Sequence, residues 1–100
     1  MIAYEVTVEV DDGLIERYTE FMQSRHIPQV LATGCFTLAE FDRASETRFR
    51  ARYLADNLAD LERYLERHAP RLRADYARHF PEGTKLTREI WEELHRWKAE

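Results

Sequence analysis

One histidine of this chain has the surroundings that a catalytic or ligand-binding side chain needs. His26 follows Tyr18 and Met22 at intervals of four residues, so the three side chains lie on one apolar stripe of a predicted helix. An imidazole held among apolar groups has a pKa that shifts easily across neutrality. Such a ring can act as a general base on a carbon acid or a phenol, or bind a ligand carbonyl. The alternative is a structural histidine whose ring donates a hydrogen bond to a backbone carbonyl at the helix end.

Tyrosines are the second chemical resource of the sequence. Aromatic residues make up 12% of the chain, and Tyr4 and Tyr18 are the two tyrosines that we expect to line a pocket. A phenol beside His26 would complete a proton-relay pair in an apolar pocket with few polar groups. Met22, one helical turn before His26, is the third candidate for substrate binding. The simpler interpretation is core packing, with the tyrosine hydroxyls reaching the rim of the core.

The other reactive side chains are explained better by structure. The sequence places no base beside Cys35, and an unpaired cysteine usually packs as a small apolar group. His68 lies on a second apolar stripe and, shortly before Pro70, suits a position at a helix C-terminus. Arginines between positions 63 and 78 are interspersed with acids, which is typical of a solvated helix face. No phosphate-binding glycine loop, paired-carboxylate motif or cluster of metal ligands occurs, so we expect neither metal nor cofactor.

The strands that must position these residues follow from hydrophobic alternation. Residues 2–10, 35–43 and 46–54 alternate between apolar and polar side chains, which predicts three half-buried strands. The short turn between the last two segments indicates a hairpin. A fourth strand is predicted from Lys85 to about Leu94, although the acidic residues of this segment would also suit a short terminal helix.

Two helical segments separate the strands. The first begins near Leu14 and should end near His26, because Pro28 disfavours helical dihedral angles at the residue before it. One more turn can form at Val30–Thr33 before Gly34 stops it. The second begins after Asp56 and continues towards residue 80. Pro70 lies inside this second segment and predicts a kink or two abutting helices.

The element order β-α-β-β-α-β predicts a ferredoxin-like α+β domain, in which both helices cover one face of a four-stranded antiparallel sheet. The other face is charged. Glu5 and Glu9 of the first strand would lie beside Arg48, Arg50 and Arg52 of the third, its neighbour in the middle of the sheet. Such a face is either solvated or forms the interface of a homodimer, and composition alone leaves both possibilities open.

Composition limits the classes of protein. A chain of 100 residues forms a single domain, residues 1–100, whose core is large enough to fold without disulfides. The net charge of −4 argues against nucleic acid as the main partner. No apolar run approaches the roughly 20 residues that span a bilayer, and the N-terminus has no basic leader. We therefore expect a cytoplasmic protein without a membrane partner.

A resemblance adds to these inferences. His26-Ile27-Pro28, followed by Val-Leu-Ala-Thr-Gly-Cys-Phe at 30–36, resembles a bacterial family of small proteins that is a domain of unknown function. Residues 4–8, 60–64 and 69–72 match its pattern as well. The family is similar to the dimeric α+β-barrel superfamily, which includes antibiotic-biosynthesis monooxygenases, muconolactone isomerases, EthD-like proteins and polyketide cyclases. In EthD-like members a His-x-Pro at the end of the first helix points into the pocket, and His26-Ile27-Pro28 occupies the matching place.

The resemblance implies a homodimer and cofactor-free proton abstraction, followed by oxygenation or cyclisation of an aromatic or polyketide-like compound. We hypothesise a homodimer that binds a small organic ligand, with His26 as the base and Tyr4 or Tyr18 orienting the substrate if it is an enzyme. It would then be a monooxygenase, isomerase or cyclase. The alternative hypothesis is a non-catalytic structural or regulatory module that binds a protein partner, because likeness of fold does not establish activity.

Overall fold

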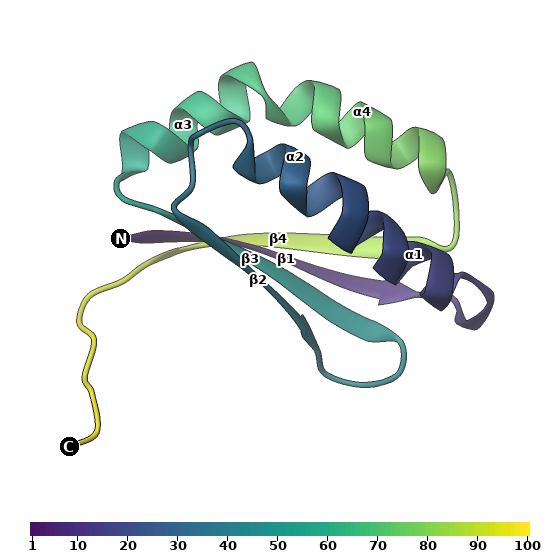
Figure 1. The fold of residues 1–100 in the computed structure, drawn as a ribbon, viewed down its shortest axis with the longest axis horizontal. Helices are drawn as coiled ribbons and strands as arrows, with labels where there is room; N and C mark the ends of the chain where they lie inside the picture. Colours follow the sequence, from purple (N-terminus) through teal and green to yellow (C-terminus); the bar gives the residue numbers. More distant parts are fainter.

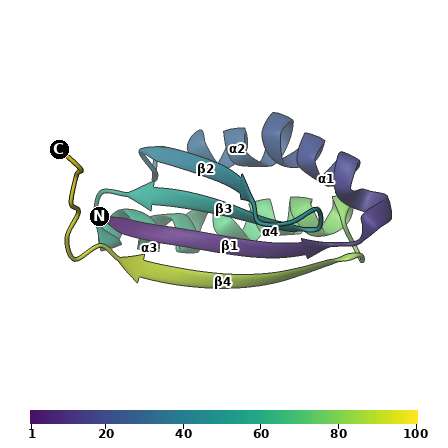
Figure 2. The same ribbon diagram turned by 90° about the horizontal axis from the view of Figure 1, so that it is seen from below.

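A four-stranded antiparallel sheet forms one layer of the protein. The computed structural model describes all 100 residues, and its strands lie in the order β2-β3-β1-β4 (Figure 2). The strands are β1 (Ile2–Val10), β2 (Leu38–Arg43), β3 (Arg48–Ala55) and β4 (Thr84–Glu92). The predicted hairpin is β2 with β3, and β1 pairs with β3 in the middle of the sheet. The predicted element order and sheet are confirmed.

The C-terminal segment leaves the sheet after the fourth strand. That strand ends at Glu92, two residues before the predicted end, and the N–H of Glu93 donates to the carbonyl of Met1 at 2.9 Å. Residues 93–100 have no regular secondary structure, so the short terminal helix is not formed. Leu94 and Trp97 are exposed on this segment, which extends away from the two layers in Figure 1.

The first helix continues past the proline that was expected to end it. It consists of α1 (Ile15–Phe21), a π-helical turn (Met22–His26) and α2 (Ile27–Leu31). The prediction of an end near His26 is therefore wrong. Pro28 has no N–H group, and the wider π-helical turn, in which the N–H of Ile27 donates to the carbonyl of Met22, accommodates its ring. The chain turns at Gly34, whose φ of +75° favours glycine.

Two shorter helices abut in the second half, as Pro70 predicted. They are α3 (Leu58–Arg67) and α4 (Ala69–His79). The side-chain oxygen of Asn57 accepts a hydrogen bond from the N–H of Asp60 at 2.9 Å and caps the start of α3. Pro70 lies in the first turn of α4, where its missing N–H breaks no helical hydrogen bond. His68 ends α3, and its Nδ1 accepts a hydrogen bond from Arg71 at 2.7 Å.

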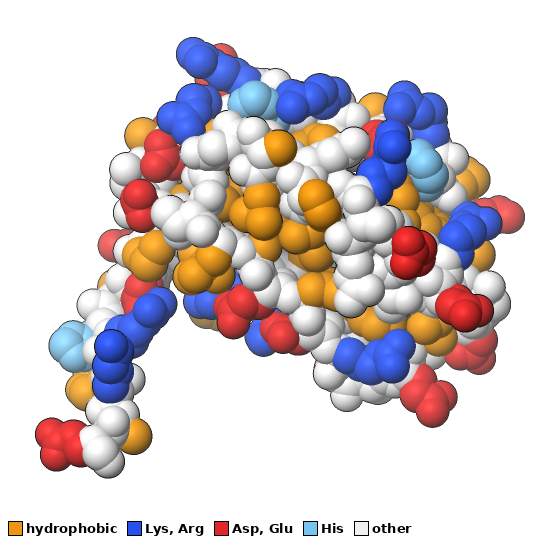
Figure 3. Space-filling view, viewed as in Figure 1, with side chains coloured by type: hydrophobic (Ala, Val, Ile, Leu, Met, Phe, Trp, Pro, Cys, Tyr) orange, Lys and Arg blue, Asp and Glu red, His pale blue; other side chains and the backbone are white.

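All the helices cover one face of the sheet (Figure 1). Nineteen buried residues from both layers form one core, and nine of them are Tyr or Phe, which come from β1, β3, α1, α3, α4 and two connecting segments. Cys35 is 2% exposed and packs within this core, as expected of a small apolar group. Figure 3 shows hydrophobic side chains across the middle of one face, with charged side chains around its border. No helix in the structure combines the length and the hydrophobicity that crossing a membrane requires.

The opposite face of the sheet carries the predicted rows of charge. Glu5 on β1 contacts both Arg50 and Arg52 of β3, with N···O distances of 3.7 and 3.6 Å. Arg50 also pairs with Asp42 at 2.8 Å, and Arg52 with Glu40 at 3.0 Å, both on β2. Glu5 and Arg52 are half-buried and the other three residues are exposed, and surface pairs of this kind contribute roughly 0–1 kcal/mol each. The charged face therefore adds little to the stability of a single chain.

Candidate functional site

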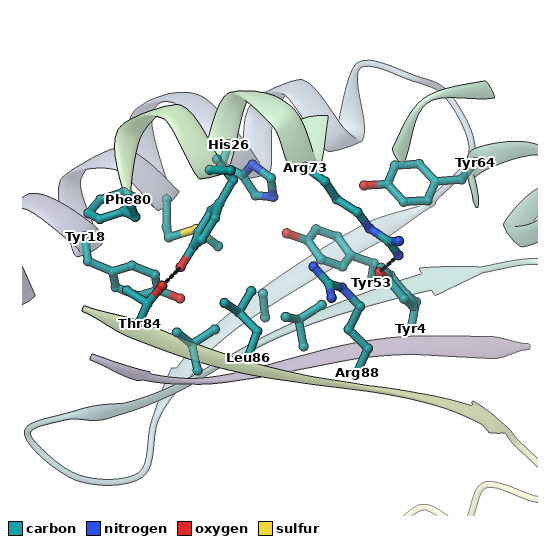
Figure 4. A pocket seen from close by; sticks show the side chains of 16 residues that line it. Tyr4, Tyr18, His26, Tyr53, Tyr64, Arg73, Phe80, Thr84, Leu86 and Arg88 are labelled. Carbon is teal, nitrogen blue, oxygen red and sulfur yellow. Dashed lines mark hydrogen bonds between the residues drawn. The ribbon is translucent and has the colours of Figure 1, made fainter. Parts of the chain in front are cut away.

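A cavity of about 260 Å³ lies between the sheet and the helices. Twelve of its 16 lining residues are hydrophobic. Its floor consists of side chains from β1, β3 and β4, and its roof of side chains from α1, the π-helical turn, α3 and α4 (Figure 4). Three lining residues are exposed: Arg73 and Ala77 on α4, and Arg88 on β4. The cavity therefore opens between α4 and the edge strand β4.

The four residues predicted to form a site all line this cavity. Tyr4 lies on β1, Tyr18 on α1, and Met22 and His26 on the π-helical turn. The hydroxyl of Tyr4 accepts a hydrogen bond from Nη2 of Arg73 at 2.9 Å. The spacing of four along one helix thus brings three of the residues to one wall, while their roles in binding or catalysis stay predictions.

Three buried polar atoms of the cavity residues have no hydrogen-bond partner in the protein. They are the hydroxyls of Tyr18 and Tyr53 and the Nδ1 atom of His26. The two tyrosines are 0% and 2% exposed, and burial raises the pKa of both phenols, so each stays a neutral hydrogen-bond donor near pH 7. An unpaired buried group of this kind costs about 1–3 kcal/mol. Their gathering around one apolar cavity indicates a wall suited to polar atoms of a ligand.

Burial also determines the charge of His26. Loss of solvation lowers the pKa of its imidazole to about 4; the Asp75 carboxylate opposes this decrease and the Arg88 guanidinium adds to it. The ring packs against Phe21 and edge-on against Tyr76, each at a centroid distance of 5.8 Å. The imidazole is therefore neutral near pH 7. Because Nδ1 is unpartnered, it does not make the backbone hydrogen bond that a purely structural histidine would make.

Two arginines that the sequence analysis did not assign to the site reach the cavity. Arg73 was expected on a solvated helix face but donates to Tyr4 across the cavity. Arg88 is opposite Val6 in the register of β1 and β4, so it shares the inward face of the sheet. The alternation along β4 that turns Leu86 inward could have predicted Arg88. No signal in the sequence separates Arg73 from the arginines around it.

The chemistry of the cavity follows from this set of groups. It offers one neutral imidazole, neutral phenols and two guanidinium cations, and no carboxylate lines it. Such groups can bind the oxygen atoms of a small organic molecule and stabilise an enolate or a phenolate. Nowhere in the chain are three or more His, Cys, Asp or Glu side chains grouped so that they could hold a metal ion.

The model of one protein family, the domain of unknown function DUF4286, matches residues 1–94 of the sequence. The chain belongs to this family. The resemblance to a domain-of-unknown-function family is thereby confirmed. No curated protein sequence matches this DUF4286 domain.

Solved structures from several organisms share the fold of the DUF4286 domain. A dimeric ferredoxin-like protein from an uncultured marine organism has a TM-score of 0.76 at 13% identity, over 96% of this chain and 97% of that one. An EthD family protein from Bacillus halodurans has a TM-score of 0.71 at 15% identity, over 94% and 100%. A variant of SnoaB, a cofactor-independent oxygenase from Streptomyces nogalater, has a TM-score of 0.70 at 10% identity, over 98% and 97%. The DUF4286 domain thus has the predicted ferredoxin-like fold, which is compatible with a dimeric α+β barrel.

Proposed function

We propose that this DUF4286 domain binds a small organic molecule in the cavity between its helices and its sheet. The observation that carries the proposal is the set of three unpartnered polar atoms, on Tyr18, Tyr53 and His26, around an otherwise apolar cavity. A ligand with a hydrophobic body would cover the apolar walls, and its polar atoms would pair with these three. Each new hydrogen bond would relieve a desolvation cost that the protein already carries, so it would add strongly to affinity.

The chemistry that we propose for an enzymatic role is proton transfer without a cofactor. The proton of an acidic C–H or phenolic O–H group would pass to a ring nitrogen of His26, and the electron pair would stay on the substrate as an enolate or phenolate. A neutral imidazole suits this step, because an imidazolium has no free electron pair. Tyr4 and Tyr18 would orient the substrate, and Met22 would contact its apolar part. An isomerase or cyclase needs no further reactant, whereas a monooxygenase would also consume molecular oxygen.

Two planar probes of equal size test the binding proposal: 2-naphthoate and its neutral analogue naphthalene-2-carboxamide. We expect calorimetry to detect binding of at least one, with chemical-shift changes at the His26 ring. Ala77→Trp would fill the mouth of the cavity and should weaken binding about tenfold or more. Ala74→Trp is the matched control, because Ala74 is also exposed on α4 but does not line the cavity. Absence of binding by both probes, or full binding by Ala77→Trp, would contradict the proposal.

We also propose that the domain forms a homodimer through the charged face of its sheet. Structural neighbours described as dimeric ferredoxin-like proteins support self-association. The face carries both signs of charge, with Glu5 between Arg50 and Arg52, so two copies related by a twofold axis can pair acid with base. Sedimentation at high micromolar concentration should give a dimer, and Arg52→Glu should weaken it while Arg71→Glu, on the helix layer, should not. A monomer at that concentration would exclude this dimer.

A further inference from the structure

The charge of the cavity indicates the class of ligand, on the condition that the proposed function holds. We infer that the DUF4286 cavity selects an anionic ligand: an aromatic body that carries a carboxylate or an ionised enol or phenol, with the oxyanion held between Arg73 and Arg88.

The first observation is an imbalance of charge. The chain has 19 acidic and 15 basic residues, yet the cavity is lined by two arginines and no acid. Neither Arg73 nor Arg88 takes part in an ion pair of the structure, and no acidic side chain lines the cavity to neutralise them. Two positive charges at one opening therefore lack a negative partner within the protein.

The second observation is the placement of the two guanidinium groups. Arg73 descends from α4 and Arg88 rises from β4, so they approach the cavity from its roof and its floor (Figure 4). The hydrogen bond from Arg73 to the Tyr4 hydroxyl, 2.9 Å long, orients that guanidinium and leaves its other N–H groups available. The unpartnered hydroxyl of Tyr53, on β3, adds a buried donor within the same cavity. Planar guanidinium groups match the two oxygens of a carboxylate.

The third observation is that the field of Arg88 crosses the cavity. Burial lowers the pKa of His26, and Arg88 lowers it further. Burial raises the pKa of Tyr64 and of Tyr76, and Arg88 opposes that increase in both. These three residues lie on three different helical segments of the roof. A charge that acts on all of them also acts on any ligand between them, and it favours an anion.

The apolar walls determine what must be attached to the anion. Twelve of the lining residues are hydrophobic, and Val6, Val8, Leu86 and Phe80 are among them. A bare inorganic anion would leave these walls without contacts and would keep most of its hydration at the opening. A planar hydrocarbon body would instead pack against the aromatic and branched side chains while its charged end reaches the two arginines.

The matched probes separate this inference from the proposed function. We expect the wild-type protein to bind 2-naphthoate about tenfold or more tightly than naphthalene-2-carboxamide, because charge-assisted hydrogen bonds are the stronger kind. Arg88→Gln and Arg73→Gln should each weaken 2-naphthoate binding about tenfold and carboxamide binding far less, so that most of this preference is lost. Arg71→Gln is the control, because Arg71 lies on α4 outside the cavity. Inorganic phosphate should bind far more weakly than 2-naphthoate.

Each contrary result has a distinct meaning. Equal binding of both probes, with loss in Ala77→Trp, would overturn the anion preference and leave the binding cavity supported. If Arg88→Gln weakens carboxamide binding as much as 2-naphthoate binding, the anion preference is also overturned, because Arg88 would then contribute packing rather than charge. Phosphate binding as tight as 2-naphthoate binding would overturn the requirement for an apolar body. Absence of binding by every probe would contradict the proposed function itself.

Discussion

Removing the hydroxyl of Tyr53 should stabilise the protein, although it deletes a polar atom from a buried tyrosine. The hydroxyl is buried without a hydrogen-bond partner, whereas the ring that carries it packs against other aromatic rings. Tyr53→Phe would keep the ring contacts to Tyr4 and Phe36, whose centroids lie 6.2 and 5.4 Å away. The change therefore removes a desolvation cost without removing packing.

The size of the effect follows from the cost of an unpaired buried hydroxyl, about 1–3 kcal/mol. Because this hydroxyl borders a cavity rather than close-packed core, we take the lower end, an increase of about 1 kcal/mol in the free energy of unfolding. For a domain of this size that corresponds to a rise of about 4–8 °C in Tm. The same substitution should weaken binding of 2-naphthoate, because the ligand loses a donor.

Tyr76→Phe is the control with the opposite expected sign. The hydroxyl of Tyr76 donates to Oγ1 of Thr84 at 3.1 Å, so its removal should lower stability by about 0.5–1.5 kcal/mol. Urea unfolding followed by circular dichroism, at one protein concentration, gives both values if the m-value stays unchanged.

A destabilising Tyr53→Phe would refute the reasoning, since it would mean that the hydroxyl is already satisfied in solution. The three unpartnered atoms would then no longer indicate a ligand.

Two further predictions concern pH and can be checked by NMR titration and by urea unfolding across a pH series. The imidazole of His26 should titrate near pH 4, and a value near the ordinary 6.5 would show that the ring is exposed. As the pH decreases, the His26 ring takes up a proton in the unfolded chain before it does so in the folded protein. The contribution of His26 to stability should therefore fall between about pH 6.5 and pH 4 and then level off. The variant His26→Asn should lack this decrease. The hydrogen bond from Arg25, with further help from Arg78, lowers the pKa of the Asp75 carboxyl to about 2, although its burial opposes this. The stabilisation from Asp75 should therefore be complete above its ordinary pKa of 3.8 and be lost as the pH falls towards 2. Asp75→Asn should lower stability at pH 7 more than Asp42→Asn, whose carboxylate is exposed, and an equal effect of the two would contradict the importance of burial.

Periodicity in the sequence was sufficient for the strands and for one wall of the site. A period of two assigns each residue of a strand to one face without reference to the rest of the chain, so the rows of Glu5 and Arg52 and the hairpin were predictable. The interval of four that joins Tyr18, Met22 and His26 is equally local. These features depend on backbone geometry that every helix or strand shares.

The course of the first helix required the tertiary structure. Pro28 favours a helix end when only neighbouring residues are considered, and the helix nevertheless continues to Leu31. The buried side chains of Phe21, Met22 and Val30 pack this helix onto the sheet along its length. Burial of a continuous apolar stripe outweighs a local preference, and one π-helical turn is enough to accommodate the ring.

The charge of the cavity also required the tertiary structure. Arg73 is one of several arginines along the second helical segment, and only the distance between α4 and β1 brings it to the hydroxyl of Tyr4. The unpartnered hydroxyl of Tyr53 depends in the same way on how far the helices stand above the sheet. Which face of an element a residue occupies is a local property of the chain. Whether the space opposite that residue is filled depends on the distance between the helix layer and the sheet. That distance is set by contacts between residues far apart in the sequence, and no local pattern encodes it.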